Sequence, residues 1–172
     1  MKMRTVVSAA CCIGLCCIPA FGQATAASEK DQKFVDFAAQ TDMTEAHIGQ
    51  LAQDQASSQA IKDFAQMLVT DHTDDYRKLS DAATKAGATV PKGLDAQHNK
   101  VIAPFEKLKA AAFDRRFERE MVAGHQKAIA EYKRASADLQ NPDLKAYATA
   151  TLPALEKHLD AAKGLEKVKP GQ

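Results

Sequence analysis

Four ionisable side chains fall on the apolar faces of helical segments, where charged residues are uncommon. They are Glu45, His72, His125 and His158. Successive residues of an α-helix advance by about 100°, so that residues four apart share one face. His72 lies four residues after Leu68, and His125 and Glu45 have equivalent apolar neighbours in their own segments. His158 is predicted at the edge of its apolar stripe. Each segment therefore directs one ionisable residue toward a shared interior.

One carboxylate and three imidazoles form a ligand set for a borderline divalent cation such as Zn(II), Fe(II), Mn(II) or Cu(II). The first interpretation is therefore a mononuclear metal site in the middle of a helical bundle. Met121, one turn before His125, is a weaker candidate for an additional soft ligand. Asp71 and Asp114 are candidate acceptors for the ring N–H groups of the ligands.

The same four residues have a second interpretation that needs no metal. Buried histidine and glutamate side chains hydrogen-bond to one another, and such networks fix the register of packed helices. The sequence contains no compact ligand motif such as H-E-x-x-H or C-x-x-C to decide between the two interpretations. His47 is expected to face solvent and His98 to lie in a connecting segment, so neither joins the set.

Apolar residues at helical spacing predict four long helices, at about 28–52, 58–87, 112–139 and 142–166. Short turns join the first to the second and the third to the fourth, whereas about two dozen residues separate the second from the third. This pattern predicts an all-α, antiparallel four-helix bundle with a long crossover that contains a short extra helix, broken at Pro104. Strict up-down-up-down topology would require the crossover to pack on one end. Pro153 predicts a kink in the fourth helix or a break between two shorter ones.

Residues 1–26 have the pattern of a cleaved signal peptide. Lys2 and Arg4 precede an uncharged apolar run, and small residues at Ala24 and Ala26 offer cleavage sites. All four cysteines lie in this segment, so that the mature domain, residues 27–172, has no thiol chemistry. A lipid anchor on Cys11 is the disfavoured alternative, because the apolar run before it is short. Such a segment predicts secretion across the inner membrane.

Composition excludes several functional classes. The formal charge is +1 over 172 residues and falls to −1 without Lys2 and Arg4. The sequence therefore lacks the excess of basic residues that is typical of nucleic-acid-binding proteins. No later segment approaches the length of a transmembrane helix. A P-loop, a dinucleotide glycine fingerprint and a nucleophile elbow are all missing from the sequence. The sequence gives no partner, although an envelope protein or a second copy of the chain remains open.

Four blocks of sequence together resemble one exported bacterial family. The blocks are EAHIGQLA at 45–52, FAQMLVTDH at 64–72, FD with MVAGH at 113–125, and TLP with HL at 151–159. The family is known as domain of unknown function 4142 and is grouped with ferritin-like four-helix bundles. The resemblance implies a ferritin-like fold, export to the periplasm or the outer-membrane fraction, and no established activity. Lys109-Ala110 stands where a Ser-Gly break is more usual, which indicates an earlier start for the third long helix.

Two functions are expected from these observations. The first is a binding module that holds one metal ion through Glu45, His72, His125 and His158 for buffering or sensing. The second is a metal-free structural or stress-related interaction bundle of the cell envelope. Ferritin-like di-iron enzymes use Glu-x-x-His pairs, and no glutamate here has a histidine three residues later. An enzyme is therefore the least favoured reading.

Overall fold

The computed structural model describes residues 27–165, so that the predicted leader 1–26 and the last residues, 166–172, lie outside it. The described residues form five helices and no strand. The helices are α1 (Glu29–Gln55), α2 (Gln59–Ala86), α3 (Ala96–Ile102), α4 (Ala110–Asp138) and α5 (Pro142–Leu165). Within this range no helix is long and apolar enough to cross a membrane. The four long helices and the short helix of the crossover confirm the predicted elements.

Local side-chain chemistry sets the ends of these helices. Ser28 caps α1 by accepting a hydrogen bond from the backbone N–H of Asp31 at 3.1 Å. Gly87 ends α2 in the left-handed conformation, with φ of 69°, which glycine adopts without steric cost. Asn141 accepts from the backbone N–H of Asp143 at 3.0 Å and so starts α5 beside Pro142. α5 continues through Pro153, so that the alternative of two shorter helices is wrong.

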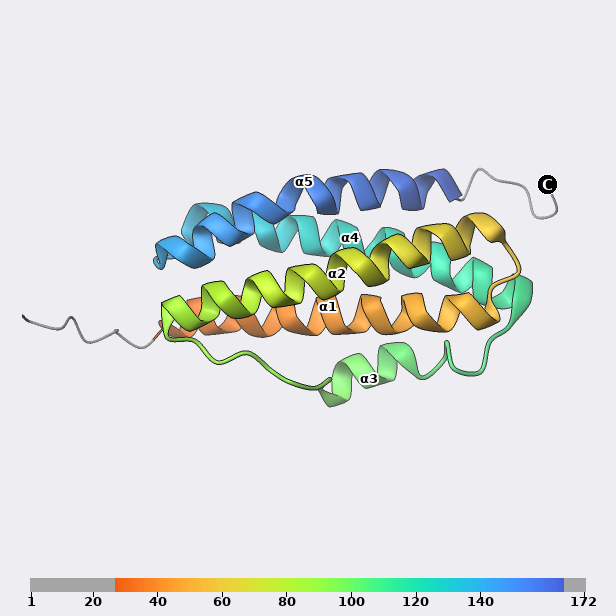
Figure 1. The fold of residues 1–172 in the computed structure, drawn as a ribbon, viewed down its shortest axis with the longest axis horizontal. Coiled ribbons are helices and arrows are strands. Elements are labelled where there is room, and N and C mark those ends of the chain that lie inside the picture. Colours follow the sequence, from red (N-terminus) through yellow and green to blue (C-terminus); the bar gives the residue numbers. More distant parts are fainter. Residues whose placement is uncertain (1–26, 166–172) are drawn as a thin grey trace, which may run out of the picture.

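The four long helices form a ring in which every neighbouring pair is antiparallel (Figure 1). α1 pairs with α2 and α4 pairs with α5, and contacts of α2 with α5 and of α1 with α4 close the ring. Residues 87–109 run along the length of the bundle and carry α3 against α1. The crossover therefore returns the chain to the end where α2 begins, as the predicted fold class requires.

Two glutamine side chains of α1 attach the crossover to the bundle. The Gln32 amide donates to Thr89 O at 2.7 Å and accepts from Thr89 N–H at 2.9 Å. Two turns later, the buried Gln40 amide donates to Gly93 O at 2.9 Å and accepts from Asp95 N–H at 3.0 Å. Each amide satisfies both a donor and an acceptor of irregular backbone, which fixes the path of the crossover on α1.

The apolar core consists of two clusters with a polar layer between them. One cluster surrounds Phe34 and Tyr132, and the other surrounds Phe113 and Phe117. On each long helix, the ionisable residue predicted for the interior lies in sequence between the residues that enter the two clusters. On α2, for example, Leu68 belongs to the second cluster, Leu79 belongs to the first, and His72 lies between them. The polar layer is therefore at mid-height of the bundle.

The start of α4 is strained. α4 begins at Ala110, two residues before the predicted start near Ala112, as the Lys109-Ala110 departure indicated. Ala110 has φ of 49°, in the left-handed region where the Cβ of an L-residue crowds the following carbonyl. Glycine has no Cβ and adopts this conformation freely. The Ser-Gly pair usual in the resembling family would suit this backbone better than Lys109-Ala110.

Replacing Ala110 with glycine is expected to stabilise the fold. Ala110→Gly relieves the positive φ, and the gain exceeds the added entropy of the unfolded chain, giving about 0.5–1 kcal/mol in the free energy of unfolding by urea titration. Ala112→Gly, inside the first turn of the same helix, is the matched control and should lower stability by about 0.5–1 kcal/mol. A loss of stability in both variants would contradict the strain at Ala110.

Candidate metal centre

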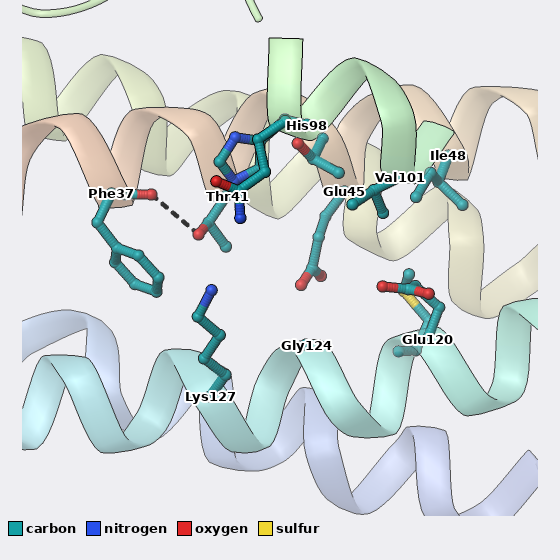
Figure 2. A pocket seen from close by; sticks show the side chains of 12 residues that line it. Phe37, Thr41, Glu45, Ile48, His98, Val101, Glu120, Gly124 and Lys127 are labelled. Carbon is teal, nitrogen blue, oxygen red and sulfur yellow. Dashed lines mark hydrogen bonds between the residues drawn. The ribbon is translucent and has the colours of Figure 1, made fainter. Parts of the chain in front are cut away.

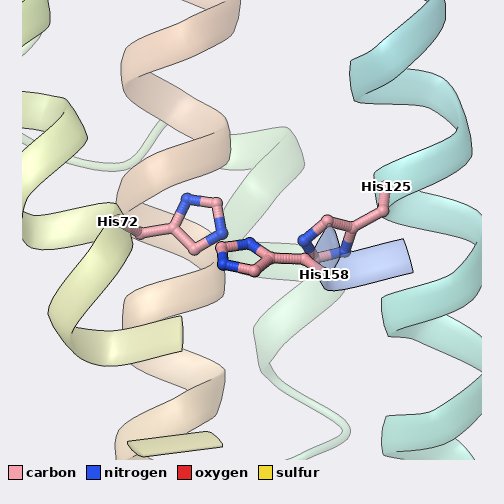
Figure 3. A group of neighbouring side chains, drawn as sticks. All are labelled: His72, His125 and His158. Carbon is pink, nitrogen blue, oxygen red and sulfur yellow. The ribbon is translucent and has the colours of Figure 1, made fainter. Parts of the chain in front are cut away.

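The structure brings the four predicted side chains together in the polar layer. α1 supplies Glu45, α2 His72, α4 His125 and α5 His158, and the three imidazole rings point toward one another (Figure 3). One nitrogen from each ring lies within 4.8 Å of the others. His72 Nε2 and His125 Nε2 lie 3.1 and 3.2 Å from the same carboxylate atom, Glu45 Oε2. All four residues are buried, with exposed fractions of 0–4%.

The second ring nitrogen of each histidine faces an acceptor outside the cluster. The pairs are His72 Nδ1 with Asp42 Oδ1 at 2.9 Å, His125 Nδ1 with Met121 O at 2.8 Å, and His158 Nε2 with Asp71 Oδ2 at 2.9 Å. Each acceptor holds an N–H on the outer nitrogen of its ring. The inner nitrogen of a neutral imidazole then carries a lone pair directed at the centre. Metal-bound histidines are held in the same way by an outer acceptor.

The atoms that face the centre lack hydrogen-bond partners. They are Glu45 Oε2, His72 Nε2, His125 Nε2 and His158 Nδ1. The two short distances from Glu45 do not have hydrogen-bond geometry, so that proximity alone does not satisfy these groups. A buried polar atom without a partner costs about 1–3 kcal/mol. Four such atoms in one buried cluster are the pattern expected of a site that is completed by a ligand.

The spacing of these atoms suits a small cation. Bonds of about 2.0–2.1 Å in a tetrahedral zinc site place neighbouring ligand atoms about 3.3 Å apart. The distances of 3.1 and 3.2 Å from Glu45 Oε2 to two imidazole nitrogens are close to this value. The imidazole nitrogens, which lie within 4.8 Å of one another, need only a small approach to reach it. The residues therefore fit one divalent ion.

Opposing electrostatic effects act on the cluster when no cation is present. Burial acts to lower the pKa of His72, but the carboxylates of Glu45 and Asp42 outweigh it and raise this pKa to about 10. Burial also raises the pKa of Asp42 to about 6. Burial acts to raise the pKa of Glu45, but the neighbouring imidazoles hold it below its usual range. Burial lowers the pKa of His158, and the charges of the other two histidines act in the same direction. The site thus concentrates negative charge around His72.

A cavity of about 120 Å³ lies between α1, α3 and α4, and the Glu45 side chain is part of its lining (Figure 2). Gly124 of α4 faces the carboxylate across this space, and a Cβ at that position would lie 3.1 Å from Glu45 Oε1. One carboxylate oxygen of Glu45 therefore faces the cavity side, while the other faces the imidazoles. The missing side chain at Gly124 leaves room for the carboxylate between α1 and α4.

The family model described as "Domain of unknown function (DUF4142)" matches residues 18–165. The chain belongs to this family. The resemblance carried by the four sequence blocks is thereby confirmed, and the blocks at 45–52, 64–72, 113–125 and 151–159 supply all four residues of the polar layer. The family description gives no activity for these residues.

Among solved structures, the chain is similar to one described as "Crystal structure of DUF305 fragment from Deinococcus radiodurans". The TM-score is 0.71 at 15% sequence identity, over 83% of this chain and 99% of that chain. At this identity the similarity shows a shared helical fold and nothing about the site. No curated protein matches the sequence.

The structure corrects several details of the predicted site. His158 is 1% exposed and belongs to the centre of the layer, not to its edge, because α5 turns that face toward α2. Asp71 accepts a hydrogen bond from His158 as expected. Asp114 instead accepts hydrogen bonds from the backbone N–H groups of Ser57 and Ser58, at 3.0 and 3.2 Å. The expectation for Asp114 is therefore wrong, because α4 places it against the turn between α1 and α2.

Met121 and Asp42 show what sequence spacing could and could not predict about the site. Met121 packs in the second apolar cluster and contacts His125 through its backbone carbonyl. Asp42, which is buried and binds His72, was missed. Its spacing of three residues before Glu45 places both on one face of α1, and this signal could have identified it.

Removing the charge of Glu45 is expected to change the titration of His72. In Glu45→Gln the pKa of His72 should fall from about 10 toward the ordinary value of 6.5, because the main attraction that stabilises the imidazolium is lost. The measurement is an NMR titration of the metal-free protein. Glu131→Gln, which changes a half-buried carboxylate of α4 that is paired with Arg134 and lies outside the cluster, is the control and should leave this titration unchanged. Equal His72 titrations in Glu45→Gln and the unsubstituted protein would contradict the assigned interaction.

Proposed function

We propose that this protein binds one divalent transition-metal ion at mid-height of the bundle, through Glu45, His72, His125 and His158. The observation that carries the proposal is the cluster of three buried imidazoles, each with a nitrogen within 4.8 Å of the others, beside the Glu45 carboxylate, in which four buried atoms lack hydrogen-bond partners. The outer ring nitrogens are bonded to Asp42, the Met121 carbonyl and Asp71 in the arrangement that orients metal-binding imidazoles.

The ligand types narrow the choice of ion. Three imidazoles and a carboxylate suit Zn(II), Fe(II), Mn(II) and Cu(II), and sites of this kind generally bind Cu(II) and Zn(II) more tightly than Mn(II) and Fe(II). The cysteines of the sequence all lie at 11–17, outside the described residues, so that no described side chain offers a thiolate to the ion. A single ion is expected, because one nitrogen from each imidazole lies within 4.8 Å of the others and Glu45 Oε2 is close to two of them.

The expected role is buffering or sensing of metal in the cell envelope. Residues 1–26 have the pattern of an export signal, and a bundle that encloses its ion between two apolar clusters favours retention of the ion. The formal charge of the chain without Lys2 and Arg4 is −1, which supports neither a nucleic acid nor another polyanion as the partner.

A metal-free interaction bundle is the second candidate, and one observation favours it. Glu45 Oε2 lies 3.1 Å from His72 Nε2 and 3.2 Å from His125 Nε2, so that a protonated imidazole could neutralise the carboxylate. In this case the cluster would hold the helices in register without an ion. The two candidates differ in what substitution of a histidine does to metal content.

Alanine at either of two histidines is expected to abolish stoichiometric metal binding. His72→Ala and His125→Ala each remove one of four ligands, and affinity for Zn(II) or Cu(II) should fall by more than about 100-fold. The measurements are elemental analysis of protein purified without chelator, titration with each ion, and circular dichroism to verify that helicity is retained. His47→Ala, on the same bundle but outside the cluster, is the control and should keep about one equivalent of metal.

Either of two results would contradict the metal site. One is full metal content in both His72→Ala and His125→Ala. The other is an unsubstituted protein that takes up none of the four ions and shows no thermal stabilisation by them. The second result would support the metal-free interaction bundle.

A further inference from the structure

The polar layer is closed to solvent, so that an ion needs a way to reach it. His72, His125 and His158 are 1%, 0% and 1% exposed, and apolar clusters cover the layer from both ends of the bundle. An ion cannot pass through either cluster without losing its hydration to apolar surface, which is very costly. The approach must therefore come from the side, between helices.

The cavity between α1, α3 and α4 is such a lateral approach. Its lining includes Gln97 and Lys127, which are exposed, and Glu45 and Met121, which are buried. It therefore extends from the surface of the bundle to the carboxylate at the edge of the polar layer (Figure 2). A volume of about 120 Å³ holds several water molecules, and so accommodates an ion that keeps part of its hydration shell.

Oxygen atoms at the inner end of the cavity could replace the water of an arriving ion. Thr44 lines the cavity, is 6% exposed, and its hydroxyl has no hydrogen-bond partner. Other helical threonines behave differently, since Thr41 and Thr70 donate to the carbonyl four residues earlier. Thr44 thus keeps its hydroxyl free beside Glu45, in the space that leads to the metal centre.

Glu45 occupies the boundary between the cavity and the imidazoles. Its Oε1 is the atom that a Cβ at Gly124 would approach to 3.1 Å, and its Oε2 is the atom near His72 and His125. A carboxylate in this position can bind an ion from the cavity and transfer it to the imidazole nitrogens by rotating about its side-chain bonds. Glu120, which also lines the cavity, adds a second carboxylate, 3.7 Å from the Arg116 guanidinium, and Lys127 lines the cavity as well.

The opposite side of the cluster offers a poorer approach. Asp71 is the partly exposed residue there, with a side-chain exposure of 39%, and it accepts a hydrogen bond from His158 Nε2 at 2.9 Å. An ion that arrived at Asp71 would meet the protonated face of the imidazole, whereas the lone pair on Nδ1 points inward. Binding from this side would require that hydrogen bond to break and the ring to turn.

We infer that the cavity between α1, α3 and α4 is the passage through which the metal ion enters and leaves, with Glu45 as the first ligand it meets. This inference rests on the proposed metal site and adds the route by which that site exchanges its ion. The short helix α3 forms one wall of the passage through Gln97, His98 and Val101. The crossover that carries this wall is held by Gln40, through Gly93 O and Asp95 N–H.

Filling the passage should slow exchange in both directions without changing affinity. In Val101→Trp, the larger side chain occupies the cavity, and Val101 is not itself a proposed ligand of the ion. Zn(II) uptake in stopped flow and Zn(II) release to a chelator should both slow by about tenfold or more, with an unchanged Kd. Ala154→Trp, which fills a different cavity, between α2 and α5, is the matched control and should leave both rates unchanged.

A glycine pair tests the role of Glu45 in the passage. Gly124→Ala places a methyl group 3.1 Å from Glu45 Oε1 and should slow Zn(II) uptake, because the carboxylate loses room to rotate. Gly164→Ala makes the same change on α5, where nothing lies within 4 Å of the new atom, and should not affect uptake. Circular dichroism of each variant verifies the fold before the rates are compared.

The outcomes separate the passage from the metal site. Unchanged uptake and release in Val101→Trp, with Zn(II) still bound through the histidines, would overturn the passage and leave the site intact. A changed Kd with an unchanged uptake rate would also overturn it, since a passage affects both directions equally. Failure of the unsubstituted protein to bind Zn(II) would overturn the metal site, and the passage with it.

Discussion

The structure depends on one constraint, which is the burial of the Glu45 carboxylate between two apolar clusters. A carboxylate in this environment must be neutralised, because an isolated buried charge is far too costly to keep. The imidazoles of His72 and His125, at 3.1 and 3.2 Å from Glu45 Oε2, supply the compensation in the absence of a cation. A divalent ion would supply it more completely, because it also satisfies the unpartnered imidazole nitrogens. The four long helices therefore pack so that their buried polar residues meet at mid-height of the bundle.

The crossover between α2 and α4 determines which helices surround the buried polar layer. Because residues 87–109 run the length of the bundle, all neighbouring helices are antiparallel and the layer is enclosed on every side by a long helix. The same crossover places α3 beside α1, where Gln32 and Gln40 bind its backbone. The wall that α3 provides converts the space next to Glu45 into a cavity with an exposed opening. The crossover between α2 and α4 therefore determines both the antiparallel arrangement of the long helices and the cavity that leads to Glu45.

The sequence predicted the helices and the four inward residues because both depend on spacing within single helices. Apolar periodicity identified the faces, and His72 and Glu45 interrupted those faces. Details that depend on contact between helices were not accessible in this way. Asp114 has the right residue type for an acceptor, yet the register of α4 places it against the turn between α1 and α2. Asp71, by contrast, is an acceptor that the sequence did predict, and the spacing of Asp42 to Glu45 carried a signal for the acceptor of His72.

The most direct test of the metal centre is anomalous diffraction from crystals of the Zn(II)-loaded protein, with data on both sides of the zinc absorption edge. The account predicts one anomalous peak in the polar layer, about 2.0–2.2 Å from Glu45 Oε2, His72 Nε2, His125 Nε2 and His158 Nδ1. The hydrogen bonds from His72 to Asp42 and from His158 to Asp71 should remain in place. A layer without a peak, in crystals that bind zinc elsewhere or not at all, would contradict the metal centre.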